Sequence, residues 1–425
     1  MSELTSPLID TSVRAADVNL SDPEFWLRPR AEREGAFHAL RQQEGLPFYR
    51  EWEFENMMFP VGPGYFALTR HEDVWFVSRN PQLFISGPGS NIADLPVEMA
   101  EFFGSMIAMD DPKHFRLRSI VSKGFTPKEV SKIEGYVLEK ARTLIDGVIE
   151  RFPNSECDFV TEIAAPLPLQ IICEMMGIPA EDEALVFNWT NTILGAGDPE
   201  FGGTMEALMA AAIGMFGYAQ SLGEDRLAHP REDLTSVIMH AVVDGERLTA
   251  QEFGSFFILL VVAGNETTRN AISHGIHALT QFPDQRETWF GDWENTTRTA
   301  VDEIVRWSSP VIHFRRTATE DVVISGTTVK AGQKVVMWYG SANRDERVWT
   351  NPYEFDVRRS LQPQQVGFGA GGPHFCLGAN LARREISVAF DEIRRRLPKM
   401  RTTGEPDYLQ SNFINGIKHL PCAWH

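Results

Sequence analysis

One stretch in the second half of the chain limits the fold more than any other part of the sequence. Thr249-Ala-Gln-Glu252 has the pattern of a helix-capping box, and apolar residues cover most of the circumference from Phe253 to Ala263. The helix is expected to run to about Gln281, because Pro283 cannot continue it. About thirty residues at ~1.5 Å each would reach ~45 Å, enough to cross a whole globule. The rest of the chain therefore has to fold around a long buried helix.

The remaining pattern predicts a mainly α-helical protein with a minor β region near its N-terminal half. Further helices are expected over residues 124–150 from a cap-like start at Thr126-Pro127, over two segments within 181–222 that glycines separate, and over Leu377–Leu397. Strands are expected at Tyr65–Thr69, Arg315–Ile324, Thr327–Val329 and Lys334–Tyr339, with a turn at Ser325-Gly326. No repeat or low-complexity linker interrupts the chain, so we expect one domain over residues 1–425, with residues 1–20 loosely ordered.

Composition excludes several classes of protein. Apolar residues make up 43% of the chain, but no window approaches 18 consecutive apolar residues, so no membrane span is expected. The first residues lack the basic and apolar regions of a signal peptide, which predicts a cytoplasmic protein. The four cysteines are scattered without CxxC pairs, which argues against a disulfide framework. A formal net charge of −18 disfavours binding to nucleic acid.

A glycine-dense loop, Phe368-Gly-Ala-Gly-Gly-Pro-His374-Phe-Cys376-Leu-Gly378, places a cysteine at the start of the last predicted helix. The partial positive charge and the free N–H groups at a helix N-terminus both favour the thiolate, which binds metals or acts as a nucleophile. Glycines let the backbone lie close to a flat ligand. Three other interpretations are a structural cysteine, a nucleophile that needs a base, and a zinc ligand. The last is disfavoured because no second ligand pair is present.

This loop resembles the haem-binding signature of the cytochromes P-450, with His374, Cys376 and Gly378 at the family's offsets and Phe368 one residue further from the cysteine. The resemblance implies that family's fold, a helix-rich triangular prism with haem b (iron protoporphyrin IX) between the long central helix and the cysteine-bearing helix. It also implies that Cys376 is the iron ligand, that Phe368 shields the sulfur, and that Gly378 lets the helix approach the porphyrin.

Polar residues interrupt the long apolar helix at Ala263-Gly264-Asn265-Glu266-Thr267-Thr268. Such groups are costly in a buried helix unless they are satisfied or functional. One interpretation is that Thr267 bonds back to its own helix while Glu266 is ion-paired. The segment also resembles the family's oxygen-binding element, which implies that Gly264 permits a distortion of the helix, that Thr267 hydrogen-bonds dioxygen or water, and that Glu266 relays protons.

The resemblance extends to two groups of charged residues. Glu303 and Arg306 match the family's Glu-x-x-Arg element, a structural network behind the haem, and Arg359 is the candidate third member. Haem propionates need buried cations and donors. By resemblance, these are His114, Arg118, Arg316 and His374. Taken singly, each of these residues is better explained as an ordinary surface charge, and the four matches in the family's order reverse that.

Three segments, Ala263–Asn270, Gly378–Glu385 and Ser411–Lys418, resemble bacterial members that hydroxylate terminal methyls of cholesterol-type side chains and methyl-branched lipids. The pocket residues implied by position are Met106, Ile107, Leu260, Ala263, Val311, Phe314, Phe413 and Ile414. His313 is a candidate contact for a polar head group. An apolar pocket suits a lipophilic guest.

The resemblance therefore implies a monooxygenase that uses O2 and two electrons to hydroxylate an unactivated C–H bond of a steroid side chain, branched lipid or terpenoid. No electron-transfer module is present, so the expected partners are a ferredoxin and its NAD(P)H-dependent ferredoxin reductase. A basic cluster on the cysteine face is expected to dock the ferredoxin: Lys113, Arg116, Lys123, Arg383 and Arg384. The alternatives are a peroxide-driven peroxygenase, fatty-acid hydroxylase or decarboxylase of the same fold, and a non-catalytic haem-thiolate binder or gas sensor.

Overall fold

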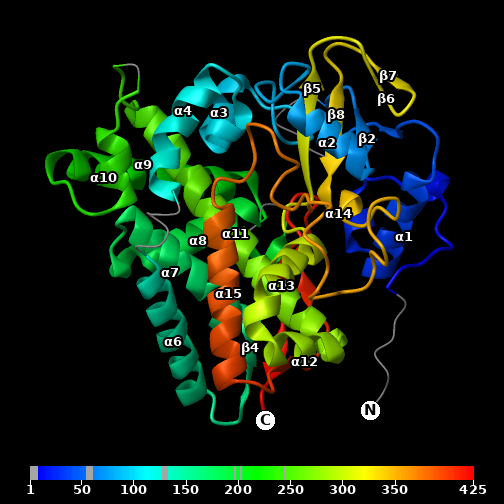
Figure 1. Ribbon diagram of the computed structural model, residues 1–425. Helices are drawn as coiled ribbons and strands as arrows, with labels where there is room; N and C mark the ends of the chain where they lie inside the picture. Colours follow the sequence, from blue (N-terminus) through cyan, green and yellow to red (C-terminus); the bar gives the residue numbers. More distant parts are fainter. Residues whose placement is uncertain (1–7, 54–60, 127–132, 196–197, 202, 244) are drawn as a thin grey trace.

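The computed structural model describes residues 8–53, 61–126, 133–195, 198–201, 203–243 and 245–425. Helices fill the left and lower parts of the molecule, and the largest sheet lies at the upper right (Figure 1). Of the segment expected to be loosely ordered, residues 1–7 lie outside the described residues, whereas Val18 and Leu20 are buried in the core.

The helices account for most of the described chain. They are α1 (Arg30–Arg41), α2 (His71–Arg79), α3 (Val97–Gly104), α4 (Lys113–Val121), α6 (Glu134–Arg151), α7 (Pro166–Met176), α8 (Glu183–Leu194), α9 (Met205–Ala228), α10 (Leu234–His240), α11 (Ala250–Gln281), α12 (Pro283–Gly291), α13 (Trp293–Ser308), α14 (Tyr339–Ala342) and α15 (Ala379–Arg396). Short 3-10 or π-helical turns join several of them, including η5 (Val160–Ala164) and η7 (Pro199–Phe201).

The long helix predicted from the sequence is α11, and its limits are confirmed. The Thr249 hydroxyl accepts a hydrogen bond from the Glu252 amide, and the Glu252 carboxylate accepts one from the Thr249 amide, so the capping box forms. The helix is 32 residues long, and most of its side chains are buried. It packs against α7, α9, α13 and α15, which makes it the centre of the main hydrophobic core.

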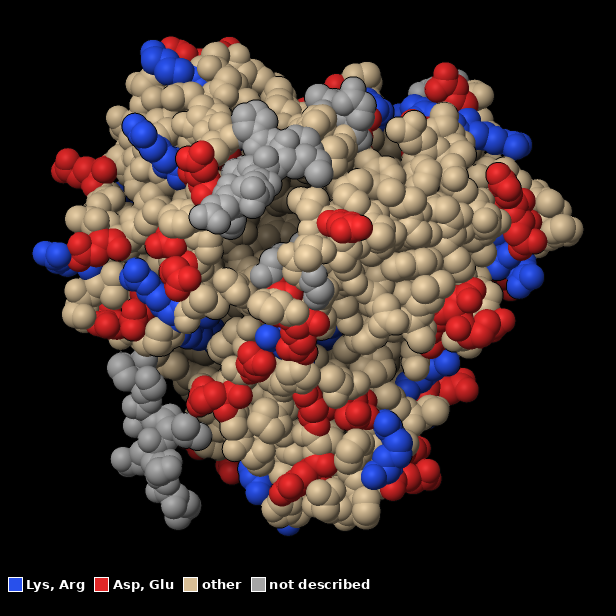
Figure 2. All heavy atoms as spheres, turned by 180° about the vertical axis from the view of Figure 1, so that it is seen from behind, with Lys and Arg blue, Asp and Glu red and all other residues tan. Residues whose placement is uncertain are grey.

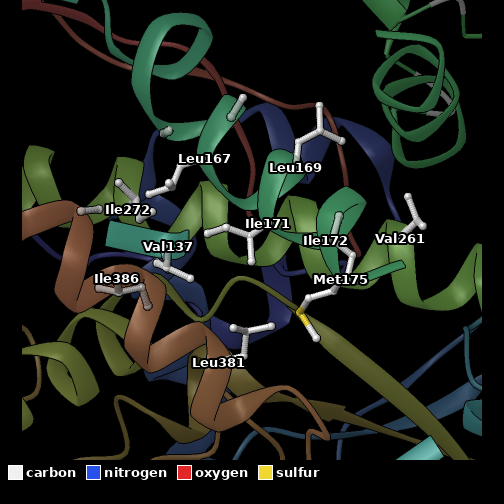
Figure 3. Packing of buried hydrophobic residues seen from close by; sticks show 14 of the residues in the cluster. Val137, Leu167, Leu169, Ile171, Ile172, Met175, Val261, Ile272, Leu381 and Ile386 are labelled. Carbon is white, nitrogen blue, oxygen red and sulfur yellow. The ribbon is translucent and has the colours of Figure 1, made fainter. Parts of the chain in front are cut away.

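Figure 3 shows part of this core from close by. Leu167, Ile171 and Ile172 of α7 lie between α11 and α15, which contribute Ile272 and Ile386 respectively. All of these side chains are almost fully buried. Apolar packing therefore fixes the distance between α11 and α15, the two helices that border the candidate site.

The largest sheet has the strand order β1-β2-β8-β5-β3. Its strands are β1 (Phe48–Tyr49), β2 (Tyr65–Leu68), β3 (Phe84–Ile85), β5 (His313–Ala318) and β8 (Lys334–Trp338), and β2 and β8 are parallel while the other neighbours are antiparallel. The β region expected near the N-terminal half supplies β1, β2 and β3, and these strands share the sheet with β5 and β8 from residues 313–338, where further strands were expected. Alternate residues of β8 enter two cores, Val335 and Met337 on one face and Val336 and Trp338 on the other.

Smaller sheets complete the β structure. In one of them β12 (Pro421–Ala423) lies between β4 (Glu156–Asp158) and β9 (Arg401–Thr402) and pairs with both. In the other two, β6 (Val322–Ile324) pairs with β7 (Thr327–Val329), and β10 (Asp407–Tyr408) pairs with β11 (Ile417–His419). The single strand expected over 315–324 is two, β5 and β6, which belong to different sheets. The turn between β6 and β7 is confirmed, with positive φ at Ser325 and Gly326.

Two of the predicted helices differ in extent from the structure. The helix expected from residue 124 begins at Glu134, and residues 127–132 of its cap-like start lie outside the described residues. The helix expected at Leu377–Leu397 begins two residues later, at Ala379, because Leu377 and Gly378 still belong to the cysteine loop. The two helices expected within 181–222 are α8 and α9.

Candidate functional site

An internal cavity lies between α11 and the cysteine loop that precedes α15. Its empty space is about 1380 Å³, including solvent at the mouth. Most of the residues predicted for the site line this cavity: Met106, Ile107, Arg118, Leu260, Ala263, Gly264, Thr267, Val311, Phe314, Arg316, Phe368, His374, Cys376 and Gly378.

The cysteine loop owes its shape to glycines. Gly369, Gly371 and Gly372 have φ values of +92°, +75° and +76°, a region that other residues rarely adopt. A side chain at Gly372 would overlap the backbone carbonyl of Ser78 at the end of α2. The Cys376 amide donates to the Phe368 carbonyl oxygen at 2.9 Å and closes the loop. The loop therefore holds its cysteine in one backbone geometry.

The side chain of Cys376 is exposed to the internal cavity. Burial within the protein raises the pKa of the thiol, and the Gly378 amide, Arg118 and Arg383 lower it. A Cβ atom on Gly378 would meet no atom within 4 Å, so the space beside the sulfur is open. The guanidinium carbon of Arg383, on α15, lies 4.5 Å from the ring centroid of Phe368, which is on the cysteine loop.

A cluster of basic side chains lies at one edge of the cavity, with His114 behind His374. The His114 and His374 rings have centroids 4.3 Å apart and are tilted by 39°, and the buried Nε2 of His114 has no hydrogen-bond partner. Arg118 donates to the Phe375 carbonyl at 2.5 Å, and the buried Arg316 donates to the Arg315 carbonyl at 2.7 Å. Within the described residues neither arginine has an ion-paired carboxylate.

Burial without a counter-charge has a clear electrostatic consequence at this edge. It lowers the pKa of Arg316, and it lowers the pKa of His374 to about 2 with the help of Arg316 and His114. Buried cations are stable when they are paired with anions. The unpaired Nε2 of His114 and the two arginines thus fit the anionic propionates of haem, and the exposed sulfur fits its iron.

The α11 wall carries the predicted polar group, but its residues point in different directions. Thr267 lines the cavity, and its hydroxyl donates to the Ala263 carbonyl at 2.8 Å. Glu266 is buried, is absent from the lining, and pairs with Arg269 at 2.6 Å. Burial raises the pKa of Glu266, and Arg269 lowers it. α11 is a continuous α-helix through Gly264, where a distortion was expected.

Phe413, Ile414, Glu266 and His114 were predicted for the site but do not line the cavity. Ile414 is buried in a β-bridge with Val311, and the Phe413 ring packs on His313 and Phe314. His313 binds the Asn412 carbonyl through Nδ1 at 2.9 Å and is also absent from the lining. Phe413, Ile414 and His313 therefore pack behind the cavity wall that Val311 and Phe314 form.

Sequence reasoning missed several lining residues. Phe256, Leu259, Thr268 and Ala271 come from α11, and Glu385 and Ile386 come from α15. A signal for some of them was present: Phe256, Leu260, Ala263, Thr267 and Ala271 repeat at helical spacing, so they share one face. Burial raises the pKa of Glu385 well above its usual value, and nearby Thr268 opposes this effect.

The Glu303–Arg306 network forms behind the cysteine loop, and Arg359 is its third member, as expected. Glu303 accepts hydrogen bonds from Arg306 at 2.6 and 2.7 Å and from Arg359 at 3.0 Å. It also accepts the Asp356 amide at 2.9 Å. Arg306 donates further to the Asn343 and Pro352 carbonyls. The network ties α13 to the loop that leads towards Cys376.

The predicted basic cluster is less basic than its sequence indicates. Lys113 pairs with Glu101 at 2.6 Å, Arg116 with Glu252 at 2.7 Å, and Arg383 with Asp302 at 2.9 Å. Arg384 pairs with Glu134. On the rear face, acidic side chains are spread over the lower half with basic ones among them, and a hollow opens near the centre (Figure 2). Within the described part of the chain no helix is long and apolar enough to cross a membrane.

Comparison with known proteins gives consistent results. The family model for Cytochrome P450 matches residues 295–398. The chain is 51% identical over 412 residues to a methyl-branched lipid omega-hydroxylase of Mycobacterium tuberculosis, covering 97% of this chain and 96% of that protein. It is 43% identical over 364 residues to a steroid C26-monooxygenase of Rhodococcus jostii, covering 84% of this chain and 75% of that protein.

Solved structures agree. A Mycobacterium marinum cytochrome P450 in complex with pseudoionone superposes with a TM-score of 0.91 at 37% identity, covering 99% of this chain and all of that one. A cytochrome P450 of a Bacillus subtilis polyketide synthase gives 0.83 at 29% identity, covering 96% and 99%. With a relative at 51% identity over nearly its whole length, the chain belongs to the cytochrome P450 family, and it is a monooxygenase.

Proposed function

We propose that this cytochrome P450 hydroxylates a terminal methyl group of a lipophilic substrate, either a methyl-branched lipid or a steroid side chain. The observation that carries the proposal is a largely apolar cavity bounded by Cys376 on one side and Thr267 on the other. The names of the two curated relatives point to the same kind of substrate. A long apolar guest would gain about 25 cal/mol for each Å² of apolar surface it buries.

The residues of the cavity fit haem b. Cys376 would bind the iron through its sulfur, and His114, Arg118, Arg316 and His374 would pair with the propionates. When bound, the haem supplies the activation of dioxygen and the oxidation of the C–H bond. The amide of Gly378 and the charge of Arg118 would stabilise the anionic sulfur, which is what a thiolate ligand requires. Phe368 would keep water away from it.

On the opposite wall, Thr267 would act on oxygen through its hydroxyl. The hydroxyl can donate one hydrogen bond at a time, so it must leave the Ala263 carbonyl to donate into the cavity. Glu266 would supply protons only after its ion pair with Arg269 opens, because the carboxylate is turned away from the cavity. Gly264 lies one residue after Ala263, and a side chain there would meet Ile172.

The substrate would occupy the apolar part of the cavity. Its wall is formed by Met106, Ile107, Leu260, Ala263, Val311 and Phe314, supported from behind by Phe413 and Ile414. All six of these side chains are apolar. We therefore infer that shape and apolar area, rather than a charged anchor, select the substrate here.

A ferredoxin and its NAD(P)H-dependent reductase would supply the electrons. Arg383 and Arg384 lie at the start of α15, close to Cys376 in sequence, and Arg384 is half-exposed. An acidic ferredoxin would have to compete with Asp302 and Glu134 for them. Charge reversal of both arginines to Glu should slow ferredoxin-driven turnover at low salt and leave substrate binding unchanged. Unchanged turnover would rule out this docking surface.

The substrate class can be tested directly. Purified holoenzyme is titrated with methyl-branched fatty acids, cholesterol-type steroids and terpenoids while the Soret band is followed, and the products with a ferredoxin system are identified by mass spectrometry. The proposal predicts a spectral shift and a terminal alcohol from the first two classes. Oxidation at a ring position or at an internal chain carbon only would overturn it. A matched control is Ala263→Phe, which should lose the shift but keep the haem.

A further inference from the structure

Two cysteines far apart in sequence meet in the small sheet of β4, β12 and β9. Cys157 of β4 is the direct partner of Cys422 of β12 in an antiparallel pair. Their sulfur atoms are 3.6 Å apart. Cys422 is buried, Cys157 is half-buried, and neither lines the cavity. The site described above therefore gives no account of this pair.

The register places both side chains where a bond can form. The Trp424 amide donates to the Ser155 carbonyl, and the Phe159 amide donates to the Leu420 carbonyl. These two bonds lie two residues before and two residues after the cysteine pair along the ladder. Because hydrogen-bonded and non-hydrogen-bonded pairs alternate in an antiparallel ladder, Cys157 and Cys422 are also a hydrogen-bonded pair. Partners of that type have Cα atoms about 5.5 Å apart, which lies within the range of disulfides. Direct partners also share one face of the sheet.

The surroundings favour a covalent link over a metal site. Within the described residues the only group of His, Cys, Asp or Glu with metal-ligand spacing is Glu200, Asp407 and His419, and it does not include either cysteine. Two thiols alone are too few ligands for zinc. A pair of thiols in contact, with one of them accessible, is the arrangement from which a disulfide forms.

We propose that Cys157 and Cys422 are an oxidation site at which peroxide closes an intramolecular disulfide. The Cys157 sulfur attacks one oxygen of hydrogen peroxide, which gives a sulfenic acid and water. The Cys422 thiol then attacks that sulfur, a water molecule leaves, and the S–S bond forms. Overall two thiols and one H2O2 become one disulfide and two H2O, so the sulfurs are oxidised and the peroxide is reduced.

The reaction should be slow at neutral pH. The hydrogen bond with Cys422 and, after it, burial raise the pKa of the Cys157 thiol, and the nearby carboxylates of Glu162 and Asp158 raise it further. Only the thiolate attacks peroxide. The pair would therefore respond to sustained peroxide rather than to brief exposure. One source of sustained peroxide is oxygen reduction that is not followed by hydroxylation.

The link would hold the C-terminal strand. β12 is the central strand of its small sheet, between β4 and β9, and Cys422 also faces Thr402 of β9. The two cysteines are separated by 265 positions, so the closed loop would include α11 and most of the cavity. A link across so long a loop restricts the unfolded chain strongly. Oxidation should raise the unfolding temperature by roughly 5 °C.

The test uses the holoenzyme with hydrogen peroxide and, separately, with diamide, which oxidises thiols without haem chemistry. Free thiols are then blocked under denaturing conditions, and the peptides are mapped without reduction. The expected result is one cross-linked pair of peptides containing positions 157 and 422, lighter by two hydrogen atoms and separated by dithiothreitol. Thermal unfolding of the same samples should show the rise and its reversal.

Three serine variants complete the experiment. Cys157→Ser and Cys422→Ser should each abolish the link and the thermal shift. Cys173→Ser is the matched control and should keep both, since Cys173 is fully buried and burial raises its pKa to about 12. If Cys422→Ser fails to fold, Cys157→Ser at the half-buried position carries the test. The proposal would be overturned if both positions were still free thiols after oxidation, or if either one were linked to Cys173. This outcome does not depend on which substrate the enzyme hydroxylates.

Discussion

Across the cavity, the α11 wall is a continuous helix, whereas the wall around Cys376 is an irregular loop whose backbone depends on three left-handed glycines. On α11 the side chains that line the cavity repeat at helical spacing, and each can change without altering the backbone. In the loop the backbone itself positions the sulfur. On the function proposed above, the loop wall would hold the cofactor and the helical wall would select the substrate.

The largest expected effect lies on the loop wall. Cys376→Ser should lower the rate of hydroxylation at least about 1000-fold. Mutation of a residue that only hydrogen-bonds to a metal ligand already lowers metal affinity or activity about 10–100-fold, and loss of the ligand itself should cost more. The carbonyl complex of the ferrous protein should lose its long-wavelength Soret band. A normal band in this variant would show that Cys376 is not the ligand and would end the proposed division between the walls.

The second prediction compares a glycine from each wall. Gly372→Ala should destabilise the holoenzyme by about 3 kcal/mol, because φ is +76° and the new methyl group overlaps the Ser78 carbonyl. Gly264→Ala should change stability by less than about 1 kcal/mol, since the added Cβ makes an ordinary contact with Ile172 and alanine favours a helix. Chemical denaturation followed by haem absorbance measures both. Equal losses would mean that α11 is as constrained as the loop.

The third prediction concerns shape on the α11 wall. Ala263→Phe should weaken binding of a steroid roughly 30-fold, about 2 kcal/mol, because the ring fills space beside Leu260 and Thr267. Its carbonyl spectrum should stay normal. Spectral titration gives the affinities. If a straight-chain lipid loses as much affinity as the steroid, the wall does not select by width.

The smallest effect is expected for the polar group on α11. Thr267→Ala should lower the yield of product per electron about tenfold, the value of one hydrogen bond to a charged group, and raise peroxide. Thr267→Ser keeps the hydroxyl and should restore most of the yield. Oxygen uptake and product are measured together. Equal coupling in the alanine and serine variants would remove Thr267 from the mechanism.

Much of the fold could be predicted because the signals are local. The capping box at Thr249 and the proline at 283 set the limits of α11, and both were read correctly. The glycine loop and Cys376 could be placed beside each other for the same reason. The pairing of the strands was not predicted, because register is not local: β2 pairs in parallel with β8, more than 260 positions later. The alternation of apolar and polar residues within either strand does not indicate which strand it pairs with.

The site was predicted less evenly. Residues next to a motif, such as Thr267 and Arg316, line the cavity as expected. Glu266 does not, because its position relative to the cavity depends on the rotation of α11, and that rotation is set by packing of α7, α9 and α15 on the helix. Ion pairing of Glu266 was one of the two interpretations of the sequence, and the structure supplies Arg269 as the partner. Phe413 was placed too close for a similar reason: its ring faces His313 and Phe314.

The buried arginines at the edge of the cavity have a consequence for biosynthesis. Burial lowers the pKa of both Arg118 and Arg316, so their positive charges are costly when no anion is bound beside them. On the role proposed for these arginines, the apoprotein carries an electrostatic penalty that bound haem relieves, and haem should stabilise the folded chain. Cells short of iron should accumulate less of this protein, because the empty chain is the form that proteases reach first.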